Sequence, residues 1–387
     1  MFLLYLIIAI VLLIITFTII IKIKFKFWSI QPVFHIYNIW YWMYPPGIIN
    51  NEEPVPNKYT NLEDIIFVEY NSLSNNDKNK FIKFIQQYFL NSTEVKYKPT
   101  RENIIPYFDN TKKSFFSMFY EKDYEIDSNN VVETKQKLIA VMTSRLLNVC
   151  IRNNDFTTYY VDYLCVHKDK RNKGIAQQII QTHDYYQRTK TNIPTSLFKK
   201  EGKLHAIVPL VIYRTYGFNI EYWHNKVILH SNIQIITFNK KNINLLTNFI
   251  KSIKNIFDLY ISPDINILID LIDSKNIIIY GLIQNQQILS VYFMRDSSTF
   301  YHQRKAIDCF ASINNTNNNL FVNGLSLILK KLKNMYSYLL IENISHNYTI
   351  IEHIIKKHTP YLVSPTAYYF YNFAITPIAE KKALIIF

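Results

Sequence analysis

Glycine and cysteine are scarce in this chain of 387 residues, and several common site motifs are missing. There are six glycines and three cysteines, Cys150, Cys165 and Cys309. Three cysteines without a C-x-x-C spacing argue against a disulfide framework and a structural zinc site, and they fit a reducing compartment. The ten histidines show neither an H-E-x-x-H motif nor paired spacing, and no G-x-S-x-G sequence is present. We therefore expect no bound metal and no permanent cofactor.

Acidic residues are few relative to basic ones. The chain has 43 Lys and Arg against 29 Asp and Glu, which gives a net charge of +14. This excess suits an anionic partner, namely a phosphorylated ligand, a nucleic acid or a membrane surface. An AT-rich genome would produce the same excess without selection. Hydrophobic residues make up 49% of the chain and aromatic residues 16%, so the chain can bury a large core and is not disordered.

The first segment is a long apolar run. Residues 1–21, MFLLYLIIAIVLLIITFTIII, carry no charge, and their length is that of a helix that crosses a bilayer. A cleaved signal peptide would have a basic start, a shorter apolar core and a small-residue cleavage site, and none of these is present. Lys22, Lys24 and Lys26 follow the segment and nothing basic precedes it. We therefore predict a single-pass transmembrane anchor with the rest of the chain in the cytosol.

The remainder divides into an arm and two units of mixed type. Residues 22–60 contain an aromatic stretch with several prolines, which predicts an extended arm on a surface and then a polar linker. Residues 61–220 and 221–387 show helix and strand patterns in a similar order, which predicts two similar units. The patterns predict strands at 65–70, 137–151, 157–166, 276–283, 287–294, 306–313, 337–344, 368–375 and 382–387, and helices at 77–90, 174–189, 250–257, 265–272, 324–336 and 349–358.

A basic run lies between a predicted strand and a predicted helix. Residues 161–176 read VDYLCVHKDKRNKGIA. A helix start offers unpaired N–H groups and a positive dipole, Gly174 lets a phosphate approach the backbone, and the flanking Lys and Arg side chains add charge. The spacing R-x-x-G-x-A, from Arg171 to Ala176, is the pattern with which acyl-CoA-dependent N-acyltransferases hold the CoA pyrophosphate. A solvated basic turn with a glycine at the helix entry explains the same residues.

More of the chain resembles the N-myristoyltransferase family. YLCVHK at 163–168 and RNKGIAQ at 171–177 resemble the F-L-C-V-H-K and R-S-K-x-x-A-P signature of that family. Three further blocks resemble the family's F-W-x-T-Q-P-V arm, its F-R-F-x-Y-S-x-E-F-L-x-W-A-L segment and its Y-Y-L-Y-N-W…E-K-x-G-L-V-L ending: FWSIQPV at 27–33, VKYKPTRENIIPYF at 95–108 and the tail at 368–387. The blocks follow in the same order, so the resemblance covers nearly everything after residue 25.

The resemblance implies an α/β fold of the α+β acyltransferase type, with two similar acyl-CoA N-acyltransferase (GNAT-like) domains in tandem behind the transmembrane helix. It implies transfer of a myristoyl group from the co-substrate myristoyl-CoA to the N-terminal glycine amine of a protein or peptide. The backbone amides of Tyr163 and Leu164 would form the oxyanion hole, and the α-carboxylate of Phe387 would be the general base. We expect a monomer that binds no nucleic acid. The residues implied to hold CoA are Phe27, Trp28, Val166, Arg171, Asn172, Lys173, Gly174 and Ala176.

The chain also departs from the family. Gly174 stands where the family has a large cationic residue, and Gln177 stands where it has proline. The Y-T-A-G, N-A-L-D-L and S-F-Y-N blocks have no clear counterparts; in their places stand PTSLFKKEGKL at 194–204, YLLIENI and FASIN. Two alternatives therefore stay open: an acyltransferase with another acyl chain or amine, and an inactive adaptor that binds acyl-CoA or lipidated peptide. We expect His167 to be structural and Cys165 to be a buried, inert thiol.

Overall fold

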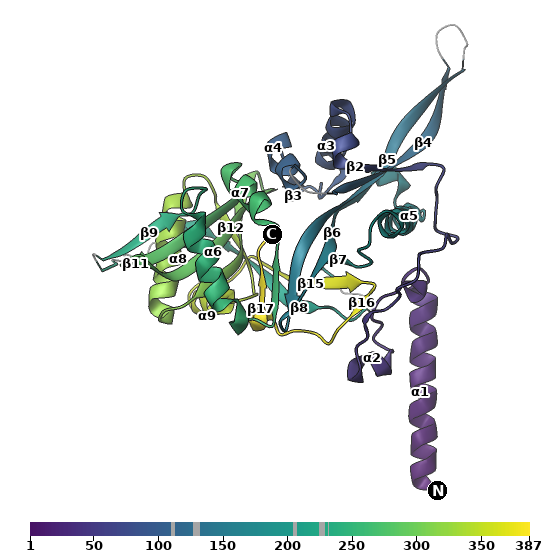
Figure 1. Cartoon of the computed structure of the whole chain (residues 1–387), viewed down its shortest axis with the longest axis horizontal. Helices are drawn as coiled ribbons and strands as arrows, with labels where there is room; N and C mark the ends of the chain where they lie inside the picture. The colour runs from purple at the N-terminus through teal and green to yellow at the C-terminus, as the bar shows by residue number, and fades with distance from the viewer. Residues whose placement is uncertain (110–112, 127–131, 204–206, 224–228, 231) are drawn as a thin grey trace.

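The computed structural model describes residues 1–387 except 110–112, 127–131, 204–206, 224–228 and 231, and it shows a mixed α/β molecule (Figure 1). The α-helices are α1 (Phe2–Lys24), α2 (Ile39–Met43), α3 (Asn75–Tyr88), α4 (Arg101–Ile104), α5 (Ile175–Lys190), α6 (Ile243–Ile253), α7 (Ile265–Asp273), α8 (Asn318–Leu332) and α9 (Asn347–Ile355). The strands are β1 (Gly47–Ile48), β2 (Ile65–Glu69), β3 (Val95–Tyr97), β4 (Phe115–Ile126), β5 (Val132–Ile151), β6 (Asn154–Val166), β7 (Ser196–Glu201), β8 (Val211–Asn219), β9 (Ile233–Thr237), β10 (Leu259–Ser262), β11 (Ile277–Gln284), β12 (Gln287–Tyr301), β13 (Arg304–Asn314), β14 (Tyr338–Glu342), β15 (Leu362–Tyr371), β16 (Phe373–Ala374) and β17 (Ala383–Ile385).

One sheet joins both halves of the chain. Its strand order is β17-β10-β5-β6-β7-β15-β8-β14-β13-β12-β11-β9, with β2, β3 and β4 attached at the sides. β15 therefore lies between β7 and β8, and the last strand, β17, runs parallel to β10, which pairs with β5. As a result the C terminus lies at the centre of the molecule (Figure 1). The division at residue 220 into two units stays a prediction, because the sheet runs continuously across it.

Each predicted helix and strand overlaps an observed element, whereas several observed strands, among them β4, β7 and β8, were not predicted. The helix predicted at 250–257 is α6, Ile243–Ile253, and a short 3₁₀ turn, Lys254–Ile256, follows it. The buried stripe of α6 consists of Ile243, Leu246 and Ile250, at spacings of three and four residues. The apolar pattern therefore begins a full two turns before the predicted start. The strand predicted at 137–151 is the C-terminal part of the longer strand β5.

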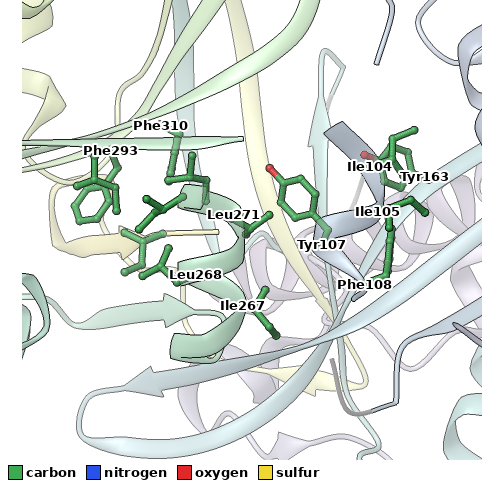
Figure 2. Close-up of a cluster of buried hydrophobic side chains, with 14 of the residues drawn as sticks. Ile104, Ile105, Tyr107, Phe108, Tyr163, Ile267, Leu268, Leu271, Phe293 and Phe310 are labelled. Carbon is green, nitrogen blue, oxygen red and sulfur yellow. The ribbon is translucent and has the colours of Figure 1, made fainter. Parts of the chain in front are cut away.

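Shared packing fixes the two halves against each other. Figure 2 shows Ile104, Phe108 and Tyr163 facing Leu271 and Phe293 across one buried cluster. Each large apolar side chain that is fully buried contributes roughly 1.5–3 kcal/mol. A cluster built from both halves holds the strands of the first half in place relative to the C-terminal segments. This rigidity matters below, because the functional site takes residues from both halves.

The N-terminal segment has two parts. α1 projects from the body (Figure 1), is exposed along almost its whole length, and is long and apolar enough to cross a membrane. The arm behind it is only partly extended, because it contains α2 and a 3₁₀ turn at Trp28–Ile30. Part of the arm is buried rather than lying on the surface: Phe27, Val33 and Phe34 are buried, and Trp28 stacks on Phe198 with ring centroids 5.8 Å apart.

Candidate active site

Strand β6 is irregular at two residues. Its pairing with β5 joins Ala140 to Val166 and Val141 to Cys165, and then resumes with Thr143 opposite Asp162. Two residues of β6, Tyr163 and Leu164, therefore oppose one residue of β5, which is a β-bulge. Tyr163 has a φ of +49°, an uncommon conformation for a non-glycine residue. In the pairing that the structure describes, the bulge leaves Tyr163 and Leu164 without a partner in β5.

The two bulge residues differ in their surroundings. The N–H of Tyr163 donates a hydrogen bond to Oδ1 of Asp162 at 2.8 Å. The Tyr163 ring is buried, and burial raises the pKa of its phenol well above the ordinary value. The Leu164 side chain is instead exposed and borders the two hollows described next. Of the two predicted oxyanion donors, the Tyr163 N–H is therefore engaged by Asp162, whereas Leu164 has no pairing partner in β5.

A cavity opens where β6 and β7 separate. The two strands pair in parallel only from Tyr159–Ser196 to Val161–Phe198, and beyond this point they leave a cavity of about 330 Å³. The cavity lies between these strands and α5, and its wall is mostly apolar. The lining residues are Trp28, Phe89, Met142, Tyr160, Val161, Asp162, Tyr163, Leu164, Ile180, His183, Asp184, Ser196, Phe198, Lys199, Lys200 and Tyr371.

A groove of about 670 Å³ adjoins the cavity. The cavity and the groove share Phe89 and Leu164, so the two hollows lie on either side of the bulge. One wall of the groove is the turn between β6 and α5. The other wall is the segment after α3, residues 88–92, together with Val95. No spacing in the sequence indicated this second wall, because it reaches the groove only through tertiary packing.

The start of α5 borders this groove and has the features that the sequence predicted for an anion site. Gly174 is the N-cap residue, with a φ of +79°. A Cβ at this position would meet only Gln177 Oε1, at 4.0 Å, so glycine is required here for its left-handed conformation and not for space. The first N–H groups of a helix have no intrahelical acceptor, and here they border the groove together with the positive end of the helix dipole.

Most of the residues implied to hold CoA are brought together here. Val166, Arg171, Asn172, Gly174 and Ala176 line the groove. Trp28 lines the cavity instead. Phe27 packs edge-on against the Trp28 ring, with ring centroids 5.1 Å apart. Lys173 is exposed and is not among the residues that line the groove.

Arg171 joins the two walls of the groove. Its Nη2 donates to the carbonyl of Tyr88 at 2.8 Å and its Nε to the carbonyl of Val166 at 3.2 Å. Both acceptors are backbone carbonyls and not carboxylates. The side chain therefore holds the two walls together while its positive charge stays unneutralised by these contacts. Lys170 is turned to Glu121, with which it forms an ion pair at 2.5 Å.

We expect Arg171→Ala to weaken the binding of acyl-CoA by about tenfold or more, because the substitution removes both a charge and the tie between the walls. Titration of the full-length protein with CoA at two salt concentrations measures this, and salt should weaken the wild type more than the variant. Arg152→Ala is the matched control, since Arg152 is exposed at the opposite end of β6. Equal affinities in Arg171→Ala and the wild type would mean that the basic run is only a solvated turn.

The last residue of the chain is buried beside the cavity. Phe387 is 3% exposed, and its ring lies 4.6 Å from that of Tyr160, which lines the cavity. Nη1 of Arg295 donates to the Phe387 main-chain oxygen at 3.2 Å. The guanidinium of Arg145 lies 5.4 Å from the Phe387 ring and is itself buried. The chain end is thus held by groups from both halves.

A buried network of charges surrounds the chain end. Arg295 contacts Asp308 at 2.6 Å and Glu342 at 3.5 Å, and Glu342 also accepts from Lys199 at 2.9 Å and from the hydroxyl of Tyr213. Burial alone would raise the pKa of Glu342, but the Lys199 and Arg295 charges hold it below its ordinary value. Burial raises the pKa of Asp308 to about 6 against the pull of Arg295. Sequence reasoning missed this network.

His167 and Cys165 have structural surroundings. His167 Nδ1 accepts from the Asp169 N–H at 3.3 Å, and burial lowers the pKa of its ring. Cys165 is buried, as expected, and burial raises the pKa of its thiol to about 12. The three cysteines are free. Within the described residues, no group of three His, Cys, Asp or Glu side chains is arranged to hold a metal ion.

Comparison with known proteins agrees with this geometry. Residues 50–193 match the model of the N-terminal domain of myristoyl-CoA:protein N-myristoyltransferase. Crystal structures of Saccharomyces cerevisiae N-myristoyltransferase with bound myristoyl-CoA share the fold: one has a TM-score of 0.71 at 13% identity and covers 95% of each chain, and another has a TM-score of 0.68 at 12% identity and covers 92% of this chain and 94% of that one. A comparison with curated protein sequences found no match.

These findings confirm the predicted α/β, GNAT-like fold. The matched segment, 50–193, contains the β6 bulge, the start of α5 and both walls of the groove. The structural likeness covers 95% of this chain. Residues 50–193 thus match the N-terminal domain of the N-myristoyltransferase family, and the chain shares the fold of the yeast enzyme of that name.

Proposed function

We propose that this acyltransferase moves a long-chain acyl group of the myristoyl type from acyl-CoA to the N-terminal glycine amine of a protein or peptide. The observation that carries the proposal is that the groove at the start of α5 and the apolar cavity meet at Leu164, which lines both. The CoA phosphates would lie at the α5 start, the thioester at the bulge and the acyl chain in the cavity. The yeast enzymes with which this chain shares its fold contain bound myristoyl-CoA.

The residues around the bulge can support the reaction in a simple order. The substrate ammonium gives a proton to a base, for which we propose the carboxylate of Phe387. The free amine attacks the thioester carbonyl, and the Leu164 N–H stabilises the oxyanion that forms. When this intermediate collapses, the carbon–sulfur bond breaks, an amide bond remains, and the CoA thiolate takes up the proton that the attacking nitrogen loses. The apolar cavity wall excludes water from the thioester during these steps.

The test is release of free CoA thiol by the full-length protein in detergent micelles. The protein is given myristoyl-CoA with a peptide that begins with glycine, or with the same peptide acetylated at its N terminus. Thiol release and peptide acylation that both require the free amine would support the proposal. Release without any peptide would indicate hydrolysis, and tight binding of acyl-CoA without release would indicate the adaptor.

One observation favours the adaptor alternative. Oδ1 of Asp162 already accepts from the Tyr163 N–H, so only one of the two implied oxyanion donors is free for substrate. Loss of one such donor typically costs 10²–10³ in rate in other enzymes. A protein that binds acyl-CoA and transfers it only slowly is therefore the second candidate. The thiol-release rate measured above separates the two.

We propose further that α1 anchors the enzyme in a membrane with the active site on the cytosolic side. Nζ of Lys22, in the last turn of α1, lies 5.8 Å from the ring centroid of Tyr37, just before α2. Trp40, Trp42 and Tyr44, in and after α2, are exposed, and such aromatic side chains favour the membrane–water interface. These rings next to the end of α1 support a body held close to the bilayer.

Deletion of residues 1–24 should convert a carbonate-resistant membrane protein into a soluble one. Expression of both forms in a glycosylating cell also reports the topology, because Asn91 is exposed and lies in an N-x-T sequence. We expect no mobility shift on deglycosylation of the full-length protein. A shift would place the body in the lumen, and a new N terminus after residue 21 would identify a cleaved signal sequence.

A further inference from the structure

An uncharged apolar surface lies on the arm, shortly after α1. No Asp, Glu, Lys or Arg stands between Lys26 and Glu52. Several large apolar side chains of this stretch are nevertheless exposed, and we call five of them the arm patch: Ile36, Ile39, Trp40, Met43 and Tyr44. Large exposed apolar patches are uncommon on monomeric soluble proteins, and they mark sites that bind another protein or a membrane. The arm patch therefore points to a partner that covers it.

The arm patch is presented by a firmly seated helix. On its inner side α2 packs against Phe34, which is 2% exposed, and the Phe34 ring centroid lies 5.7 Å from that of Tyr41 and 5.1 Å from that of Trp42. Residues at spacings of three and four share one face of a helix. The outer face of α2 and of the residue after it consists of Trp40, Met43 and Tyr44, which are 70%, 55% and 71% exposed. The helix thus turns an apolar face outward while it is anchored on its other side.

The arm patch lies on the side of the body from which α1 leaves. α1 and α2 project in the same direction (Figure 1). Ile21, in the last turn of α1, is buried, and Nζ of Lys22 lies 5.8 Å from the ring centroid of Tyr37. The 23 residues of α1 span about 34 Å as a helix, whereas the hydrocarbon core of a bilayer is about 30 Å thick. The last turn of a membrane-spanning α1 would therefore reach the headgroup layer, and the arm patch would meet that layer too.

The chemistry of the arm patch fits lipid better than protein. Tryptophan and tyrosine rings favour the membrane–water interface, where an apolar ring can keep its polar atom near water. The charged side chains that precede the patch are exposed and all cationic, which suits the phosphates of an anionic leaflet; they are Lys22, Lys24 and Lys26. An interface with a protein usually has a rim of mixed polar groups, and the stretch between Lys26 and Glu52 contributes no charged side chain to one.

Resting on the proposed membrane anchor, we propose that the arm patch is a second membrane contact, through which α2 inserts its aromatic face into the headgroup layer beside α1. An interfacial contact of this kind is reversible on its own, so α1 remains the anchor and the arm patch fixes the orientation of the body. Trp28, which lines the cavity, follows the end of α1 by four residues, which is at most about 14 Å of chain. The acyl cavity is thereby held beside the headgroup layer.

Tryptophan fluorescence of the full-length protein tests the insertion without any acyl-CoA. The protein is placed in nanodiscs of phosphatidylcholine and phosphatidylserine whose acyl chains are either plain or brominated, since bromine quenches nearby indole rings. The chain has four tryptophans, and the double variant Trp40→Phe, Trp42→Phe leaves only the emission of the other two. Phenylalanine also keeps a ring against Phe34, so α2 should stay folded. We expect brominated lipid to remove the part of the wild-type emission that the double variant lacks.

Photochemical cross-linking identifies what covers the arm patch. A benzophenone amino acid replaces Trp40 in the same nanodiscs, and in a control it replaces Met335, which is 60% exposed in the second half of the chain. We expect lipid adducts from position 40 and none from position 335. Equal quenching of the wild type and the double variant would overturn the inference. Adducts from position 40 to a second copy of the chain, without lipid adducts, would also overturn it.

The same nanodiscs separate this inference from the proposed function. Quenching and lipid adducts in a protein that transfers no acyl group would uphold the inference and contradict the proposed function. Acyl transfer by a protein whose arm patch is neither quenched nor linked to lipid would do the reverse. Resistance to carbonate extraction reports α1 separately, so an anchored protein with an unquenched arm patch would overturn only the second contact.

Discussion

Conversion of the terminal carboxylate of Phe387 to a carboxamide should lower kcat for acyl transfer by about 10²–10⁴-fold, the usual contribution of a general base. The carboxamide has nearly the same shape, so Phe387 should stay buried against Tyr160, and acyl-CoA should bind as before. The variant can be made by ligation of a synthetic C-terminal peptide to the expressed chain. The measurements are single-turnover transfer to a glycine peptide and, separately, the dissociation constant for acyl-CoA.

Two further proteins act as controls for this prediction. Phe387→Leu keeps the carboxylate and should retain most of the activity. Addition of two alanines moves the charge by several ångströms and should lower kcat as the carboxamide does. Transfer at the wild-type rate by the carboxamide protein would show that another group takes the proton, and Asp162, beside the bulge, would be the first to examine.

Glu342→Ala should destabilise the fold by about 3–5 kcal/mol, because it leaves buried cations without their counter-charge. The Glu342 side chain is 3% exposed and lies 2.9 Å from Lys199 and 3.5 Å from Arg295. Arg295 keeps Asp308 at 2.6 Å, whereas Lys199 keeps only the exposed Glu201 at 3.3 Å, so the larger part of the loss should come from Lys199. Chemical denaturation of the full-length protein, with unchanged detergent, measures the difference in the free energy of unfolding.

The surface pair of Arg304 and Glu221, 3.6 Å apart with both side chains more than half exposed, is the matched control. Glu221→Ala should cost no more than about 1 kcal/mol. The double variant Lys199→Met, Glu342→Leu should be more stable than Glu342→Ala, because it removes the stranded charge as well. A loss below 1 kcal/mol in Glu342→Ala would mean that water or relaxation compensates Lys199, and that the network is not a buried one.

The sequence by itself determined the elements whose signal is local. The apolar run at 1–21 predicted α1, and the apolar spacing of 77–90 and 174–189 predicted α3 and α5, because a helix repeats its buried face every three to four residues. The basic turn ending at Gly174 predicted the anion site, because the strand, the turn and the helix start are continuous in the chain. The resemblance of the tail pointed to Phe387, but no local pattern placed it near Tyr160.

Only the tertiary structure decided which distant residues share the site. Tyr88 and Arg171 meet across the groove, and Arg295 reaches Phe387, through contacts between segments 83 and 92 residues apart. Asp184 occupies the helix face that packs over the cavity, where periodicity alone would place an apolar side chain. Periodicity shows that a helix face is buried, but which strand covers that face depends on the order in which the strands pair in the sheet. The positions of Asp184 in the cavity wall and of the charges near the chain end both follow from that strand order.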